Sequence, residues 1–167
     1  MPRHATGRRP KPDPNATAYI FKVALTDNKT IWRRVGIRSD QTLDDLHAII
    51  FTAFDRFEEH LYSFFRTPPW LRRRAAGGDD TEYTSPNMID EADPLDGHEV
   101  YDASKTSIGS LGLKVGDKLY YLFDFGDSWF HELTVEGVGS PLESKRRYPF
   151  VAELHSPSPP QYPEVEE

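Results

Sequence analysis

The stretch LYYLFDFGDSWFH, residues 119–131, does more than any other to decide the fold. Successive side chains of an extended chain point to opposite sides, and residues 119–123 are apolar or aromatic on both. A strand with neighbours on either side has this pattern. Residues 129–138 supply a partner strand, and Gly126 and Asp127 supply turn chemistry, with Gly126 expected at a positive φ. The stretch predicts an antiparallel hairpin.

Upstream, two more segments predict a second hairpin. Residues 19–25 and 31–37 are rich in strand-forming side chains, and TDNKT at 26–30 separates them with turn-forming residues. Residues 60–65 have the aromatic content and length of a further strand.

One amphipathic helix is expected between these strands. Apolar side chains recur every three or four residues, which makes a single stripe for packing on a sheet. Thr42 followed by Asp45 is a capping signature for its start. The stripe comprises Leu43, Leu46, Ile49, Ile50, Ala53, Phe54 and Phe57.

These elements predict an α+β fold with a single mixed β-sheet packed by one main helix, β-grasp-like in order and extended by the C-terminal hairpin. A length of 167 residues favours one domain. We expect a flexible basic tail at 1–17, the domain at 18–154 with a long acidic loop at about 67–103, and a Pro-rich acidic tail at 155–167. Within that loop we expect a mobile stretch and one or two short elements.

The composition of the chain excludes some kinds of site and argues against some kinds of ligand. The chain has no cysteine, so disulfides and thiolate sites are excluded, and its formal net charge of −7 argues against broad binding to phosphate backbones. Basic residues gather at the start of the chain, whereas residues 75–104 contain nine Asp or Glu and no Lys or Arg. No apolar run is long enough to cross a bilayer, and we expect a cytoplasmic protein without a membrane partner.

Three blocks carry a family resemblance: IWRR at 31–34, Leu46-His47 followed by His60-Leu61, and YLFDFGDSWFH at 121–131. Together, over residues 19–162, the chain resembles the Ri-plasmid open-reading-frame-three-like family, whose members are also described as insertion-element passenger proteins. The resemblance implies one α+β domain and a link to plasmids and mobile elements, with no assigned activity. Many members end in a cysteine-containing, Pro-rich tail; this chain has SPSPPQY at 156–162, so any role of those cysteines does not carry over.

Asp124, Asp127 and His131 are the candidate catalytic residues. If the hairpin turn has two or four residues, Asp124 lies opposite Trp129, and His131 projects from the same face. A carboxylate–imidazole pair of this kind could orient a general base for a metal-dependent hydrolase or nuclease-like enzyme. The alternative, which we favour, is that both aspartates cap the turn and His131 is a half-buried strand residue.

A metal site would draw on His47, His60, His131 and Asp124. The histidine spacings match no standard zinc motif, so we expect no metal and no cofactor. His47 is predicted at the boundary of the apolar stripe, and His60 either precedes a strand or closes the helix.

The leading hypothesis is a small non-enzymatic interaction module that contacts a protein partner through Trp32, Arg33, Arg34, Tyr62 and Trp129. Arginines and aromatic rings could also contact nucleic acid, as could the 72–74 arginines. The alternative is that Trp32 belongs to the core and the arginines pair with the acidic loop. A further alternative is a nucleic-acid accessory protein acting through the basic tail residues Arg3, Arg8, Arg9 and Lys11.

Overall fold

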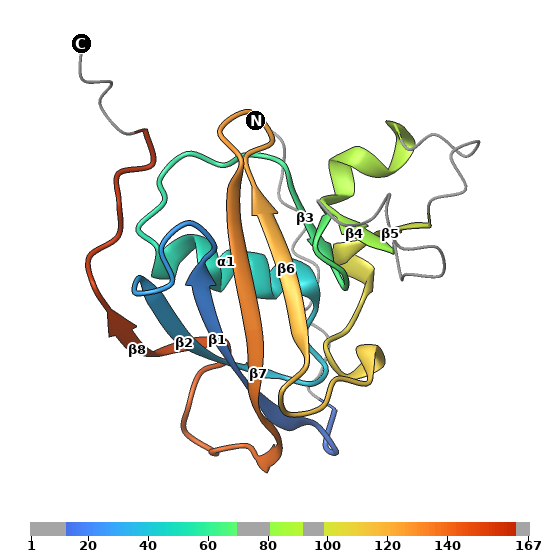
Figure 1. Cartoon of the computed structure of the whole chain (residues 1–167). Helices are drawn as coiled ribbons and strands as arrows, with labels where there is room; N and C mark the ends of the chain where they lie inside the picture. The colour runs from blue at the N-terminus through green and yellow to red at the C-terminus, as the bar shows by residue number, and fades with distance from the viewer. Residues whose placement is uncertain (1–12, 70–80, 92–98, 163–167) are drawn as a thin grey trace, which may run out of the picture.

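A computed structural model describes residues 13–69, 81–91 and 99–162. One mixed, eight-stranded sheet carries α1 (Leu43–Ala53) on one of its faces (Figure 1), which confirms the α+β class and the single sheet with one main helix. The strands run in the order β5-β4-β3-β6-β7-β1-β2-β8 across the sheet. Their bounds are β1 (Thr17–Leu25), β2 (Trp32–Arg38), β3 (Tyr62–Phe65), β4 (Glu82–Thr84), β5 (Val100–Asp102), β6 (Lys118–Phe123), β7 (Trp129–Pro141) and β8 (Phe150–His155).

Both predicted hairpins are present, and the second lies at the centre of the sheet. β1 pairs with β2, and β6 pairs with β7, each antiparallel. β7 also pairs with β1 along its length, so the terminal hairpin is built into the middle of the sheet and does not extend it at an edge. Every pairing is antiparallel except that of β4 with β5.

The expected helix begins as its sequence predicts. The Thr42 hydroxyl accepts from the Asp45 backbone N–H, and the Asp45 carboxylate accepts from the Thr42 N–H, which completes a capping box. Leu43, Leu46 and Ile50 are buried against the sheet. The stripe ends earlier than predicted, because the helix stops at Ala53 and Phe57 is 71% exposed beyond it.

The loop between β6 and β7 differs from the prediction. Phe123 pairs with Trp129, so five residues, not two or four, connect the strands, and Asp124 lies outside the ladder. The positive φ angles belong to Asp124 (61°) and Ser128 (55°), not to Gly126. Aspartate tolerates this conformation because its short side chain bonds to nearby backbone N–H groups.

The predicted acidic loop contains more short elements than the one or two expected. β4, β5 and the 3₁₀ helices η2 (Pro86–Glu91) and η4 (Ala103–Lys105) lie there, and η5 (Gly109–Leu111) follows. β4 extends the sheet beyond β3. Residues 70–80 and 92–98 of the predicted loop lie outside the described residues, so the expectation of a mobile stretch stays a prediction.

Ordered chain continues past residue 154, where we predicted the domain to end. β8 reaches His155, and Gln161 is almost fully buried. Its side-chain oxygen accepts from the N–H groups of Phe57 (2.9 Å) and Glu58 (3.2 Å), and its Nε2 donates to the Glu58 carbonyl (2.8 Å). These bonds fasten the C-terminal segment across the chain that follows α1.

Candidate functional site

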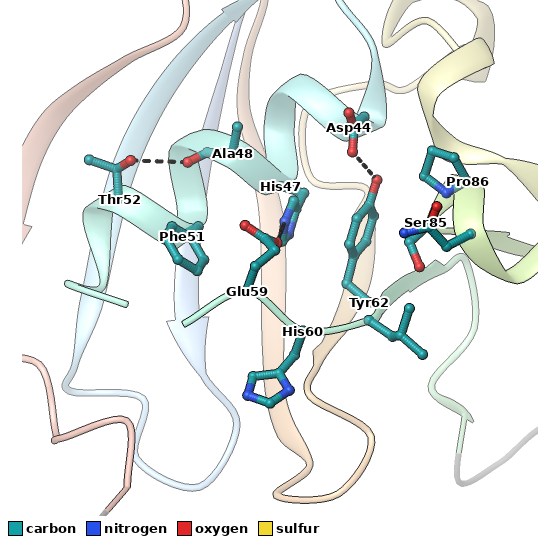
Figure 2. A pocket seen from close by; sticks show the side chains of 12 residues that line it. Asp44, His47, Ala48, Phe51, Thr52, Glu59, His60, Tyr62, Ser85 and Pro86 are labelled. Carbon is teal, nitrogen blue, oxygen red and sulfur yellow. Dashed lines mark hydrogen bonds and ion pairs between the residues drawn. The ribbon is translucent and has the colours of Figure 1, made fainter. Parts of the chain in front are cut away.

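A pocket of about 700 Å³ opens beside α1 (Figure 2). Three parts of the chain form it: one side of the helix, the segment leading into β3, and the segment after β4. Its lining residues are Asp44, His47, Ala48, Phe51, Thr52, Glu59, His60, Leu61, Tyr62, Ser85, Pro86 and Asn87.

His47 lies in the wall of this pocket with both ring nitrogens engaged. Its Nδ1 is 2.6 Å from the Tyr121 hydroxyl, and its Nε2 is 2.5 Å from Glu59 Oε1. The ring stacks on Tyr62 at a centroid distance of 3.9 Å. The predicted boundary position was wrong, because residue 47 is only 5% exposed. Burial lowers the pKa of His47, and the Glu59 carboxylate partly opposes this effect.

Tyr62 connects β3 to the start of the helix. Its hydroxyl donates a short hydrogen bond to the Asp44 carboxylate, drawn in Figure 2. Burial and the neighbouring Asp44 raise the Tyr62 pKa far above its ordinary value. Tyr62 therefore stays a neutral donor to the Asp44 carboxylate at the pocket wall.

The electrostatic character of the pocket is acidic. Asp44 and Glu59 are carboxylates, whereas no lysine or arginine of the described residues lines the pocket. The Glu59 side chain is 65% exposed, so its second oxygen is available to a ligand. Phe51 and Tyr62 add aromatic rings to the wall. Ser85 is 5% exposed, and its hydroxyl has no partner within the described chain.

Asp124 and Asp127 do not converge with His131. Asp124 is buried, and its Oδ1 accepts from the N–H groups of Gly126 (3.0 Å) and Asp127 (3.3 Å). Its Oδ2 faces His60 Nε2 at 3.4 Å. The Asp127 side chain is exposed. The turn-capping interpretation of Asp124 is confirmed, whereas its expected position opposite Trp129 was wrong.

His60 precedes strand β3, as one of the two predictions had it, and does not close the helix. The helix ends at Ala53, well before it, and β3 begins at Tyr62. Its Nε2 is 2.6 Å from the Tyr162 hydroxyl. In Figure 2 its ring points away from the group formed by His47 and Tyr62.

His131 is enclosed completely, beyond the half-burial expected for it. Its Nδ1 lies 3.0 Å from the Trp129 carbonyl and 3.4 Å from that of Tyr121, so Nδ1 carries the proton. Burial, helped by the charge of Arg56, lowers the His131 pKa to about 3.

The predicted binding residues do not share one surface. Trp32 is half-buried on the sheet face opposite α1, stacked on His155, and Arg34 on the same face pairs with Glu136 and Glu153. These partners belong to β7 and β8, not to the acidic loop, and Trp32 does not lie in the core.

Arg33, Tyr62 and Trp129 point to the helix side of the sheet. The buried Arg33 guanidinium donates to the carbonyls of Ala53 and His155, among others, and so holds the helix end to β8. The tail residues Arg3, Arg8, Arg9 and Lys11, and the arginines at 72–74, lie outside the described residues.

Sequence reasoning missed Glu59, Tyr121 and Arg56. Tyr121 was assigned only a core role, and nothing in the local pattern distinguishes Glu59 from Glu58. Among the described ranges, no group of three His, Asp or Glu side chains is arranged to hold a metal ion. Within the same ranges no helix combines the length and apolar character needed to cross a bilayer.

The family of plasmid pRiA4b ORF-3-like proteins matches residues 17–162. The chain belongs to this family. The match includes the capped helix, the central hairpin and the segment that ends in Gln161 and Tyr162, so the pocket and its supports lie within the family region. No curated protein matches the chain.

A solved structure shares the fold. It is the crystal structure of a protein of unknown function from Methanosarcina mazei Go1, with a TM-score of 0.66 and 23% sequence identity. The similarity covers 87% of this chain and 73% of the archaeal protein. At this identity the similarity shows a common fold and assigns no activity.

Proposed function

We propose that this member of the plasmid-associated family is a non-enzymatic interaction module that binds a basic side chain of a partner protein in the pocket beside α1. The observation that carries the proposal is the acidic, aromatic wall formed by Asp44, Glu59, Phe51 and Tyr62.

The state of His47 supports a binding role over a catalytic one. A general base needs a nitrogen within reach of the substrate proton, and both His47 nitrogens are occupied by Tyr121 and Glu59. The residues considered for hydrolysis are separated as well: Asp124 caps its own loop, and His131 is enclosed.

The pocket chemistry favours a cation. A guanidinium or ammonium group can bond to carboxylate oxygens and lie against an aromatic face at the same time. Asp44 and Glu59 provide those oxygens, and Phe51 provides a ring that is only partly buried. An arginine side chain, with five donors in a planar fork, matches this set best.

Calorimetric titration with a hexaarginine peptide tests the proposal. We expect Glu59→Gln to weaken binding about tenfold, because it removes one charge-assisted hydrogen bond. The matched control is Asp27→Asn, which removes the same charge from an exposed turn between β1 and β2. Equal weakening in both variants would mean that the peptide responds only to the net charge of −7 and would refute a specific pocket.

A further inference from the structure

The first described residues of the chain are anchored near the pocket beside α1. The backbone N–H of Asp13 donates to the Asp40 carboxylate at 2.9 Å, and the Thr17 N–H donates to the Ser39 hydroxyl at 3.0 Å. Asp40 lies four residues before Asp44, which belongs to the first turn of α1 and lines the pocket. The chain therefore enters its first strand near the helix end that carries Asp44.

Residues 1–12 precede this anchor, lie outside the described residues, and carry charge opposite to that of the pocket. They contain four Lys or Arg and no Asp or Glu. The pocket wall presents the carboxylates of Asp44 and Glu59, and the Glu59 side chain is 65% exposed. Opposite charges of this kind favour the approach of one segment to the other.

Residues 163–167 also follow a residue at the pocket wall, but their charge does not fit it. The Tyr162 hydroxyl is 2.6 Å from Nε2 of His60, which lines the pocket. Residues 163–167 contain three glutamates and no Lys or Arg, so the pocket carboxylates repel them. Charge complementarity therefore selects residues 1–12.

Arg8 and Arg9 have the length to reach the pocket from the anchor. They lie five and four residues before Asp13. An extended chain spans about 3.5 Å per residue, so roughly 14–18 Å of backbone separates them from Asp13 before the length of the side chain is added. The path from Asp40 to Asp44 is at most about 15 Å by the same measure.

Glu59 lies close to the same helical turn as Asp44. His47 follows Asp44 by three residues, which is about 5 Å along a helix. Its Nε2 is 2.5 Å from Glu59 Oε1. One guanidinium can therefore approach both carboxylates from the pocket.

We propose that Arg8 or Arg9 occupies this pocket in the same molecule and competes with the basic side chain of the partner. The inference rests on the proposed function, because it requires a pocket that binds a guanidinium. The carboxylates of Asp44 and Glu59 accept its N–H groups, and the Phe51 ring offers a face. A short connection gives an effective concentration on the order of 1 mM, so an arginine with a Kd of about 0.5 mM fills the pocket in roughly two thirds of the molecules.

Calorimetric titration of the whole chain with hexaarginine, at constant ionic strength, tests the competition. Arg8→Gln combined with Arg9→Gln should tighten peptide binding about threefold, because the competing side chains are gone. The matched control combines Lys145→Gln with Arg147→Gln, which removes two charges from the exposed loop between β7 and β8. Equal tightening in both double variants would mean that only net charge matters, and would overturn the proposal.

Glu59→Gln separates this inference from the proposed function. In that background the effect of the two arginine substitutions should shrink to about 1.2-fold, since a tenfold weaker arginine fills few pockets. A persistent threefold effect would place Arg8 and Arg9 elsewhere, for example on residues 163–167, and refute the inference. Peptide binding that depends on Glu59 but not on the two arginines would also refute it and leave the proposed function standing. Peptide binding independent of Glu59 would refute both.

Sedimentation velocity over a range of protein concentrations distinguishes the same molecule from a second copy. We expect a sedimentation coefficient that does not change with concentration, in wild type and in the Arg8→Gln, Arg9→Gln variant alike. A dimer that forms in wild type and is lost in the variant would place these arginines in the pocket of a second copy and overturn the proposal.

Discussion

The stability of this protein should fall in mild acid partly because of His131, and His131→Gln should remove the part of that dependence that His131 contributes. Burial holds the pKa of His131 at about 3 in the folded protein, against about 6.5 in an unfolded chain. Below pH 6.5 the unfolded chain therefore binds a proton that the folded protein rejects. His131 makes its full contribution to the free energy of unfolding well above pH 6.5. This contribution declines as the pH falls towards 3, and it does not change further below that value.

The slope follows from the same shift. One pKa unit corresponds to about 1.4 kcal/mol, so His131 alone removes roughly 2–3 kcal/mol between pH 7.5 and pH 4.5. His47, whose pKa burial also lowers, contributes with the same sign in wild type and variant, and its share cancels in the difference between them.

Urea unfolding followed by circular dichroism at about pH 7.5, 5.5 and 4.5 provides the measurement. His131→Gln should be less stable than wild type at pH 7.5, since it places an amide among Phe54 and Tyr121. The difference in the free energy of unfolding should shrink by roughly 2–3 kcal/mol at pH 4.5. A difference that stays constant over this range would show that His131 titrates normally in the folded protein, and the inference of a fully enclosed imidazole would be refuted.

Three further outcomes are expected, each measured by urea unfolding at neutral pH. Ile50→Ala should lower the free energy of unfolding by roughly 2–5 kcal/mol, because this side chain of α1 is almost fully buried. Equal stability of variant and wild type would contradict that burial. Gln161→Ala should lower the free energy of unfolding by about 2–3 kcal/mol, because three hydrogen bonds are lost. Gln161→Glu keeps the acceptor for two of them and should lower it less. A decrease below about 0.5 kcal/mol for Gln161→Ala would mean that these bonds do not hold the C-terminal segment in place. Asp124→Ala should lower the free energy of unfolding by roughly 1–2 kcal/mol, because it removes a turn cap at a residue with positive φ. Gly126→Ala should lower it by under about 1 kcal/mol. The reverse order of the two variants would contradict the loop geometry.

Local sequence determined the elements of this fold. The capping pair Thr42 and Asp45 and the spacing of Leu43, Leu46 and Ile50 specify where α1 begins and which side it buries, because these interactions lie within one or two turns of helix. The apolar and aromatic side chains on both sides of residues 119–123 likewise specify a strand with neighbours on both sides. The capping role of Asp124 was also predictable, since its bonds reach only two and three residues along the chain.

Tertiary structure decided the order of the strands in the sheet and the position of Asp124. The insertion of β7 between β6 and β1 depends on pairing between strands more than 100 residues apart in sequence, and no local pattern specifies such a partner. The five-residue loop moved Asp124 out of the ladder, because register depends on the backbone angles of the turn.

The side chains of the candidate site are also brought together by contacts between segments that lie apart in the sequence. Glu59 reaches His47 only because the chain turns back after α1, and Gln161 finds Phe57 and Glu58 across more than 100 residues. Arg56 reads in sequence as an exposed charge, but packing against Trp129 buries it. Burial, side-chain partners and pKa are properties of the neighbours that folding brings together, and for these residues the neighbours come from distant segments.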